Sequence, residues 1–253
     1  MATNQPLKGW TVVVTRPEHQ AQSICQKVKQ LGGMVIAIPA VEIVPPSNSN
    51  TFDECLQNHS QYDLSIFISQ NAVRSVFDRM ALLGLQWQGQ LAAVGSATAN
   101  ALIAQKQQVI IPADADYRSE GVLTELTKLD LKGVRVAIYR AQDGRNWLKQ
   151  QLEMLGALVT YIESYRRLPV DQSIDQGLLR YEAGTRLVSL CTSVEVTQNY
   201  LKRLDTADFK VATNSLMIVP SERVKQLIER STKNVIVAKS ALDADMLAAI
   251  PAY

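Results

Sequence analysis

The sequence predicts an α/β protein built as two similar lobes, each a parallel sheet flanked by helices. Residues 7–45 recur without a gap as residues 131–169, a spacing of 124 residues, which indicates an internal duplication. In each copy, β-branched runs alternate with segments of helical periodicity, and this alternation favours parallel sheets covered on both faces. A chain of 253 residues with 47% hydrophobic content is also long enough for two cores.

The first copy opens with a strand–helix–strand unit. A β-branched run over residues 10–15 predicts the first strand, and Ile24, Val28 and Leu31 fall at helical spacing in the segment that follows. The pair Gly32-Gly33 ends this helix, because glycine is favoured just beyond a helix C-terminus. Residues 34–38 then predict the second strand.

The remaining elements follow the same alternation. Short strands are predicted over residues 62–69, 91–94 and 109–111, with helices beginning near Asn71, Ser96 and Ser119. The second copy repeats the pattern from Val134 onward, with later strands near residues 187–190, 216–219 and 235–237.

Two extended segments occupy equivalent places in the copies and are expected to link the lobes. Pro45 and Pro46 exclude a helix in the first segment, and Pro169 ends the second. We therefore expect linkers at residues 41–45 and 165–168. The domains would be a discontinuous one, residues 1–40 with 169–253, and a continuous one, residues 46–164, with the active cleft between them.

The amino-acid composition argues against several classes of binding partner. Lys+Arg 26 against Asp+Glu 24 gives a net charge of +2, without the basic stripe that nucleic-acid binding requires. Three widely spaced cysteines and two histidines form neither a disulfide framework nor a metal-ligand cluster, and both histidines are expected at the surface. A polar N-terminus and the lack of a long apolar run predict no membrane segment, hence a cytoplasmic protein, expected to be a monomer.

Candidate binding residues lie just after the predicted strands. Ligands of parallel α/β sheets bind at the carboxyl ends of the strands, where helix N-termini present free N–H groups. Small, hydroxylated or amide residues there also act as ordinary helix caps, and both roles remain open. Their recurrence in both copies favours a ligand with many carboxylates. The predicted binding residues are Arg16, Ser69, Asn71, Gly95, Ser96, Ala97, Thr98, Arg140, Arg145, Ser193 and Ser221.

No cofactor or metal is expected. The first predicted strand is followed by Thr15-Arg16-Pro17-Glu18 rather than by the glycine-rich turn of a dinucleotide site. The chain also lacks a phosphate-binding loop of the G-x-x-x-x-G-K type.

Several of these segments together resemble the uroporphyrinogen-III synthase family, and the resemblance covers nearly the whole chain. No single motif is specific, but their order and spacing are. The segments are Val13-Val14-Thr15-Arg16-Pro17, Leu31-Gly32-Gly33, Ile66 to Val73, Ala93 to Ala99, Ser119 to Leu123, Gly144-Arg145 to Leu152, Gly156 and Tyr165. The sequence departs from the family in its last quarter, where Val219 to Arg223 replaces a glycine–threonine turn found in many members.

The resemblance implies a cyclising hydro-lyase of haem and tetrapyrrole biosynthesis that needs no cofactor. Its substrate would be hydroxymethylbilane, a linear tetrapyrrole with eight carboxylates, which closes to uroporphyrinogen III with loss of water and inversion of the last pyrrole ring. The resemblance also implies that Tyr165 assists departure of the hydroxyl and that Ser69, Thr98 and Ser193 line the cleft. From the residues alone, Tyr165 is equally consistent with an aromatic packed against one lobe.

Two other functional classes of protein share some of these sequence features. A two-lobed solute-binding protein has duplicated α/β lobes, but it is normally exported, and the polar start of this sequence leads us to expect no signal peptide. A non-catalytic small-anion binding or regulatory protein is the other alternative, and turnover distinguishes it from an enzyme.

Overall fold

The computed structural model describes residues 5–111, 119–144, 146–172, 174, 185–205, 215–229 and 234–252. Tertiary contacts divide the chain into two compact units. Unit 1 comprises Met1–Glu42 and Leu168–Tyr253, and unit 2 comprises Ile43–Arg167. Within the described ranges, no helix combines the length and apolar character needed to cross a bilayer.

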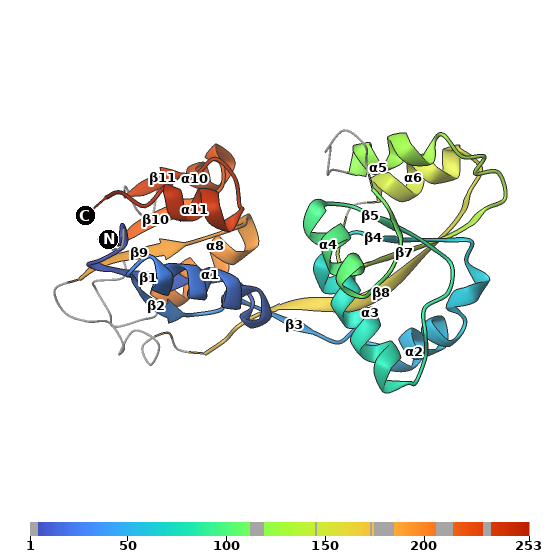
Figure 1. Ribbon diagram of the computed structural model, residues 1–253, viewed down its shortest axis with the longest axis horizontal. Coiled ribbons are helices and arrows are strands. Elements are labelled where there is room, and N and C mark those ends of the chain that lie inside the picture. Colours follow the sequence, from blue (N-terminus) through green and yellow to red (C-terminus); the bar gives the residue numbers. More distant parts are fainter. Residues whose placement is uncertain are drawn as a thin grey trace. The chain divides into compact units, whose positions relative to one another are not determined.

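The sheet of unit 1 has five strands in the order β11-β10-β9-β1-β2, and its strand pairs are parallel. In Figure 1, strands from the start of the chain lie beside strands from its end in this sheet. The strands are β1 (Trp10–Val14), β2 (Met34–Ala37), β9 (Arg186–Leu190), β10 (Leu216–Val219) and β11 (Val235–Val237). The helices are α1 (Glu18–Gln30), α8 (Val194–Asp205), α10 (Glu222–Ile228) and α11 (Asp243–Ala248).

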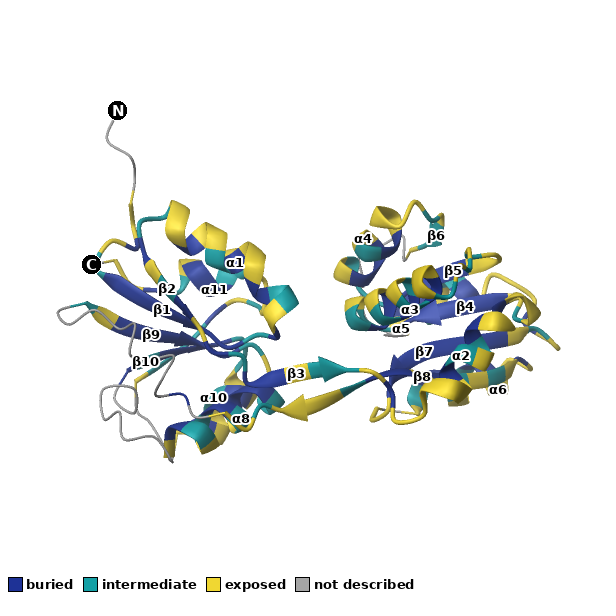
Figure 2. Ribbon diagram, turned by 90° about the horizontal axis from the view of Figure 1, so that it is seen from below, coloured by how far each residue is buried: buried dark blue, intermediate teal, exposed yellow. Residues whose placement is uncertain are grey.

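Helices cover both faces of this sheet, α1 and α11 on one side and α8 and α10 on the other (Figure 2). Ile24 and Val28 of α1 pack with Met246 of α11 against Val12 and Val14 of the central strand. All five residues of β1 are buried, as expected for a strand with a helix on each face.

The sheet of unit 2 has six strands in the order β3-β8-β7-β4-β5-β6. The strands are β3 (Val41–Val44), β4 (Leu64–Phe67), β5 (Gln90–Ala93), β6 (Val109–Ile110), β7 (Arg135–Ala141) and β8 (Leu158–Pro169). The helices are α2 (Ser49–Gln57), α3 (Gln70–Leu82), α4 (Ser96–Ala104), α5 (Ser119–Leu126), α6 (Trp147–Met154) and a 3-10 turn at His59–Gln61.

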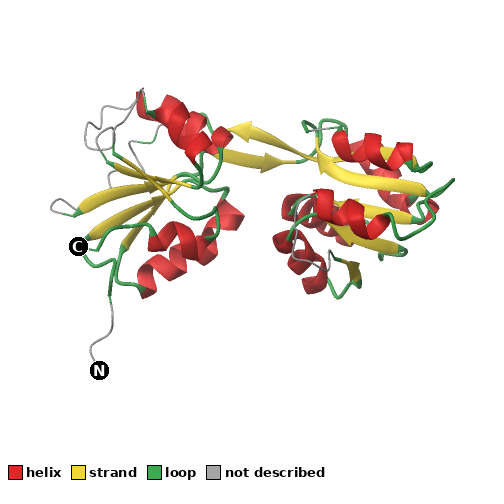
Figure 3. Ribbon diagram, turned by 90° about the horizontal axis from the view of Figure 1, so that it is seen from above, coloured by secondary structure: helices red, strands yellow, loops and turns green. Residues whose placement is uncertain are grey.

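Helices cover both faces of the unit 2 sheet (Figure 3), and a hydrophobic cluster fills the space between the sheet and the helices on each face. The first cluster joins α2, α3 and α4 to the sheet and includes Phe67 and Tyr139, whose rings stack 4.7 Å apart. The second joins α5 and α6 to the opposite face and includes Val136 and Ile138. Adjacent residues of β7 thus alternate between the two clusters, as the pleat of a strand requires.

The duplication is visible in the strand pairing. Thr11 pairs with Met34, and the residues 124 positions later, Arg135 and Leu158, pair in the same way. Each sheet nevertheless combines elements from both copies, since β1 and β2 join β9 to β11, while β7 and β8 join β4 to β6.

The two segments expected to be extended linkers are extended, and they are neighbours in one sheet. β3 lies beside β8, and the N–H of Val170 also donates to the carbonyl of Ala40 at 3.3 Å. The guanidinium Nε of Arg166 donates to the carbonyl of Pro45 at 3.1 Å. Pairing satisfies backbone groups that a single extended strand would leave to water.

One expectation from the sequence is wrong. His59 was expected at the surface, but only 6% of it is exposed. Its Nδ1 lies 2.7 Å from the carbonyl oxygen of Leu56, and its Nε2 accepts the N–H of Gln88 at 3.1 Å. The neutral ring with the proton on Nδ1 satisfies both contacts, so the side chain can be buried beside Trp87 without leaving a polar atom unpaired.

Candidate functional site

The strands of unit 2 bring several predicted site residues to one edge of the sheet. Phe67, Ala93 and Tyr139 are in register at the carboxyl ends of β4, β5 and β7. Ser69 and Asn71 follow β4, and Gly95 to Thr98 follow β5, whereas Arg140 is the penultimate residue of β7 and Tyr165 lies on β8. One group of the predicted binding residues is therefore gathered at this edge of unit 2.

The hydroxyl groups of Ser69 and Tyr165 meet at this edge. Their oxygens lie 3.0 Å apart, and either can donate. Ser69 is the N-cap of α3, with extended backbone, and its Oγ accepts the N–H of Ala72 at 3.1 Å. The phenol of Tyr165 is thereby linked through one hydroxyl to the N-terminus of a 13-residue helix.

Tyr165 is fixed from several sides. Its carbonyl accepts the N–H of Gln142 at 3.0 Å, and its backbone pairs with Ala141 of β7. Its ring belongs to the hydrophobic cluster that α3 covers, and only 3% of the residue is exposed. The side chain therefore combines a packed ring with a hydroxyl held at a defined place.

The N-terminus of α4 differs from that of α3 because Gly95 occupies the cap position. Gly95 has φ 97°, and no side chain in the described part of the chain caps this helix. The neighbouring Ser96 is half-buried, Ala97 is exposed and Thr98 is 3% exposed. The first N–H groups of α4 have no partner within an α-helix, so they are suited to an anionic ligand.

Charge distinguishes the edges of the two sheets. The first turns of α3, α4 and α6, which follow β4, β5 and β7, contain no acidic residue. In unit 1, the first turns of α1, α8 and α10 carry Glu18, Glu195 and Glu222, and α11 begins with Asp243. A carboxylate in the first turn of a helix competes with an anionic ligand for the helix N-terminus. The carboxyl edge of the unit 2 sheet is therefore better suited to bind an anionic ligand than that of the unit 1 sheet.

Arg140 is held by protein groups. It is 4% exposed, its Nε donates to the carbonyl of Ala141 at 3.0 Å, and its Nη1 donates to Oδ1 of Asn146 at 3.3 Å. The guanidinium lies 4.3 Å from the ring centre of Tyr161, within cation–π range. A Cβ on Gly144 would come within 2.3 Å of the guanidinium, so any larger residue there would require the guanidinium to shift. Arg145, predicted with Arg140, lies outside the described residues.

The predicted site residues of unit 1 form a second group. Arg16, Ser193 and Ser221 follow β1, β9 and β10, whose carboxyl ends lie side by side in the sheet. Ser193 accepts the N–H of Val196 at 3.3 Å and so caps α8, whereas the side chain of Ser221 makes no cap bond to α10.

Arg16 is paired with a residue that the sequence did not single out. Its Nη1 lies 2.6 Å from Oδ1 of Asp243, and its Nη2 donates to the carbonyl of Ala241 at 2.5 Å. Lys27 adds a second ion pair to Asp243 at 3.0 Å. Partial burial raises the pKa of Asp243, but the hydrogen bond from Lys27 and the charge of Arg16 outweigh it, so the pKa is below the usual 3.8.

Sequence reasoning also missed Ser75 and Ser164. The Oγ of Ser75 donates to the carbonyl of Ser164, and the Oγ of Ser164 donates to the carbonyl of Arg140 at 3.0 Å. Both residues adjoin the Ser69–Tyr165 contact, Ser75 on α3 and Ser164 next to Tyr165 on β8. No motif marks them, because their importance depends on an irregular strand pairing.

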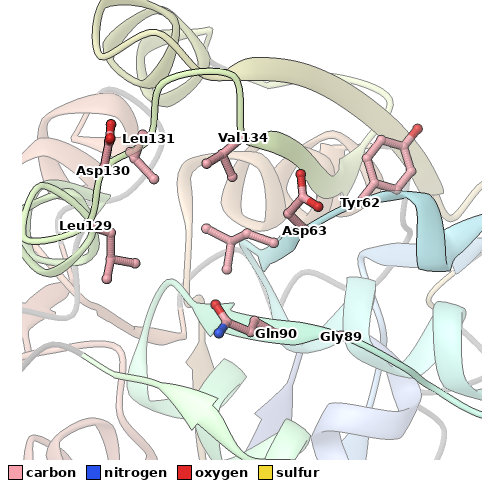
Figure 4. Close-up of a pocket in the computed structure, with 9 residues that line it drawn as sticks. Tyr62, Asp63, Gly89, Gln90, Leu129, Asp130, Leu131 and Val134 are labelled. Carbon is pink, nitrogen blue, oxygen red and sulfur yellow. The ribbon is translucent and has the colours of Figure 1, made fainter.

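A pocket of about 500 Å³ lies at the opposite edge of the unit 2 sheet (Figure 4). Its lining comes from the amino ends of β4, β5 and β7 and from the segment before β7: Tyr62, Asp63, Leu64, Gly89, Gln90, Leu129, Asp130, Leu131 and Val134. The carboxylate of Asp63 accepts the backbone N–H of Arg135 at 2.8 Å. Because ligands of parallel α/β sheets bind at the carboxyl ends, the pocket is not our candidate site.

Among the described residues, no three side chains of His, Cys, Asp or Glu are grouped so that they would hold a metal ion. All three cysteines are free thiols. Burial raises the pKa of Cys191 to about 12, which keeps it protonated at neutral pH.

Comparisons with known proteins agree with the resemblance in the sequence. The family model described as uroporphyrinogen-III synthase HemD matches residues 22–248. The uroporphyrinogen-III synthase of Synechococcus elongatus is 30% identical over 203 residues, which cover 78% of this chain and 75% of the relative.

Two solved structures share the fold. The uroporphyrinogen-III synthetase of Helicobacter pylori aligns with a TM-score of 0.62 and 13% identity, over 94% of this chain and 96% of that one. A mutant uroporphyrinogen III synthase of Thermus thermophilus aligns with a TM-score of 0.53 and 16% identity, over 94% and 96%.

Proposed function

The chain belongs to the uroporphyrinogen-III synthase family, the cyclising lyases of haem and tetrapyrrole biosynthesis, and on that premise we propose how its residues act. Its substrate is hydroxymethylbilane and its product is uroporphyrinogen III. The reaction breaks the terminal C–O bond, releases water and joins the first and last rings with inversion of the last ring.

Positioning is the main task of such an enzyme. Loss of the hydroxyl gives a stabilised azafulvene cation, which can close spontaneously to the uninverted isomer. The protein must therefore hold the chain folded so that the substituted carbon of the last ring attacks. No redox change takes place, so the residues of the chain have only to bind carboxylates and move a proton.

The contact between Ser69 and Tyr165 is the observation that carries the proposal. The Oγ of Ser69 accepts the N–H of Ala72, so its own proton is available for the phenol oxygen of Tyr165. The phenol proton is then free to reach the departing hydroxyl, which leaves as water. A chain of hydrogen bonds that begins at the N-terminus of α3 orients the hydroxyl groups of Ser69 and Tyr165, so that the phenol proton points away from Ser69.

The helix N-termini at the same edge are proposed to bind substrate carboxylates. Those of α3 and α4 have no acidic residue in their first turns, and Gly95 leaves α4 without a side-chain cap. Each such terminus contributes roughly 0.3–1 kcal/mol toward an anion at a surface site. Ser69, Asn71 and residues 95–98 are proposed as the binding residues of unit 2, and Arg16, Ser193 and Ser221 as those of unit 1.

The burial of Tyr165 is also what a packing residue would show. With 3% of its surface exposed, its hydroxyl has to be uncovered when substrate binds. Two observations favour a role in the reaction: the hydroxyl lies at the carboxyl edge of the sheet, and its partner caps α3 rather than filling the core. The Tyr165→Phe variant separates the two roles.

The decisive experiment supplies hydroxymethylbilane and separates uroporphyrinogen isomers III and I by chromatography. We expect isomer III to dominate, also after exhaustive chelation and dialysis, because the proposed chemistry uses no metal or organic cofactor. Formation of isomer I at the spontaneous rate would instead favour a non-catalytic anion-binding protein. We further propose that the protein acts as a monomer in the cytoplasm, and sedimentation of the purified chain tests the first point.

A further inference from the structure

We propose that Ser164 is a positioning residue, which turns Tyr165 toward α3 through a β-bulge in β8. The proposal rests on the role assigned to Tyr165 above. In the pairing of β7 with β8, Arg140 is opposite Glu163 and Ala141 is opposite Tyr165, with a register shift between them. Ser164 is therefore an extra residue in β8 without an opposite residue on β7, the arrangement that defines a bulge.

The bulge changes the face of the sheet that Tyr165 occupies. Before it, Val159 and Tyr161 pack against the cluster that α5 and α6 cover, while Ile162 packs against the cluster that α2, α3 and α4 cover. Strict alternation would place Tyr165 with Val159 and Tyr161. Tyr165 instead lies in the same cluster as Ile162, because one inserted residue reverses the alternation.

Two serine hydroxyls hold the bulge. The Oγ of Ser164 donates to the carbonyl of Arg140 at 3.0 Å, and the carbonyl of Ser164 accepts the Oγ of Ser75. Ser164 is fully buried, so these bonds take the place of ladder bonds that the extra residue cannot make. Ser75 belongs to α3, the helix whose N-cap is Ser69.

α3 therefore contacts β8 at two adjacent points, the bulge through Ser75 and the phenol through Ser69. These contacts fix both the backbone that carries the Tyr165 ring and the hydroxyl at its end. Loosening either serine of the bulge should let the ring move while leaving the chemistry of the phenol unchanged.

The test is a set of double-mutant cycles on the full chain. Ser164→Ala and Ser75→Ala should each lower kcat about five- to tenfold, the worth of roughly one buried hydrogen bond, with KM little changed. In the Tyr165→Phe background the same changes should have almost no effect on kcat, because they act only through the phenol. Ser75→Thr, which keeps a hydroxyl, should restore most of the activity.

Ser189→Ala is the matched control. It removes a buried serine hydroxyl that lies 2.9 Å from the hydroxyl of Tyr200, in unit 1. It should lower the free energy of unfolding without changing kcat. Losses of kcat that are equally large with and without the Tyr165 hydroxyl would show that the bulge serves stability alone and would overturn the proposal.

A structural readout separates this proposal from the catalytic role of Tyr165. Crystal structures of Ser164→Ala and Ser75→Ala should show the 3.0 Å contact between Ser69 and Tyr165 lengthened or lost. An unchanged contact in both variants overturns the positioning role, whatever the activities. If Tyr165→Phe is fully active while the contact is broken in the serine variants, the catalytic assignment fails and the positioning of the ring stands.

Discussion

The hydroxyl oxygens of Ser69 and Tyr165 lie 3.0 Å apart although the residues are 96 positions apart in the chain. Ser69 caps the helix that follows β4, and Tyr165 lies on β8, with β7 between β4 and β8 in the sheet. The contact depends on three features together: the N-cap of α3, the strand order of unit 2 and the bulge at Ser164.

Removing the phenol hydroxyl should reduce turnover while preserving the fold. We expect Tyr165→Phe to lower kcat roughly 10²-fold, the lower end of contributions from general acids, because water would have to protonate the leaving hydroxyl. The measurement is the initial rate and the ratio of isomers III and I. Tyr200→Phe, which removes a tyrosine hydroxyl paired with Ser189, is the control and should keep full activity. Full activity of Tyr165→Phe would remove this residue from the mechanism.

Replacing Gly95 should weaken substrate binding through the backbone of α4. At φ 97° an alanine is strained by about 1–3 kcal/mol, and relief of the strain would shift the uncapped N–H groups. We expect Gly95→Ala to raise KM. Gly89→Ala is a matched control, since Gly89 has φ 104° at the opposite end of β5, and an added Cβ there would approach nothing closer than 3.6 Å. If both variants destabilise the protein equally and neither changes KM, α4 does not bind substrate.

The ion pairs of Asp243 should make part of the stability of unit 1 dependent on pH. The folded-state pKa of Asp243 is below its ordinary value of 3.8, so its contribution is complete above that pH and is lost as pH falls through the folded-state pKa. Asp243→Asn should therefore be less stable than the parent near pH 7, with a difference that vanishes in strong acid. Denaturant unfolding at a series of pH values measures this. Asp78→Asn, which removes an exposed pair with Arg74, should change little at any pH. A difference that grows toward low pH would contradict the assignment.

Unit 2 should fold without unit 1. Residues 43–167 carry the six-stranded sheet except for the first two residues of β3 and the last two of β8, together with both hydrophobic clusters. We expect this fragment to unfold cooperatively in urea, as monitored by circular dichroism. Residues 1–125 should not, because that cut separates β1 from β9 and β4 from β7. The reverse result would mean that the folding units follow the sequence repeats.

The alternation of strands and helices was determined by the sequence, because burial on both faces of a parallel sheet leaves a direct hydrophobic signal. The helices after β4 and β5 begin at Gln70 and Ser96, close to the predicted starts. Polar residues after the strands could be found for the same reason, since strand ends and helix caps are local features. The family itself was also readable from the order and spacing of these segments, which the family model supports over residues 22–248.

Tertiary structure decided which of these residues meet. A sequence pattern gives the position of His59 but not the acceptor and donor that allow its burial, because Leu56 and Gln88 complete its hydrogen bonds through a turn and a distant loop. The face occupied by Tyr165 could not be predicted either, because a bulge is a property of two paired strands, and the extra residue exists only relative to Arg140 and Ala141.

Arg16 and Arg140 occupy equivalent positions in the two sequence copies. The fold nevertheless pairs Arg16 with Asp243 and buries Arg140 against Tyr161. The sequence therefore determined which residues are candidates for the site, because residue type and position after a strand are local features. Only the tertiary structure decided which partners these residues contact, because the contacts join residues that are far apart in the chain.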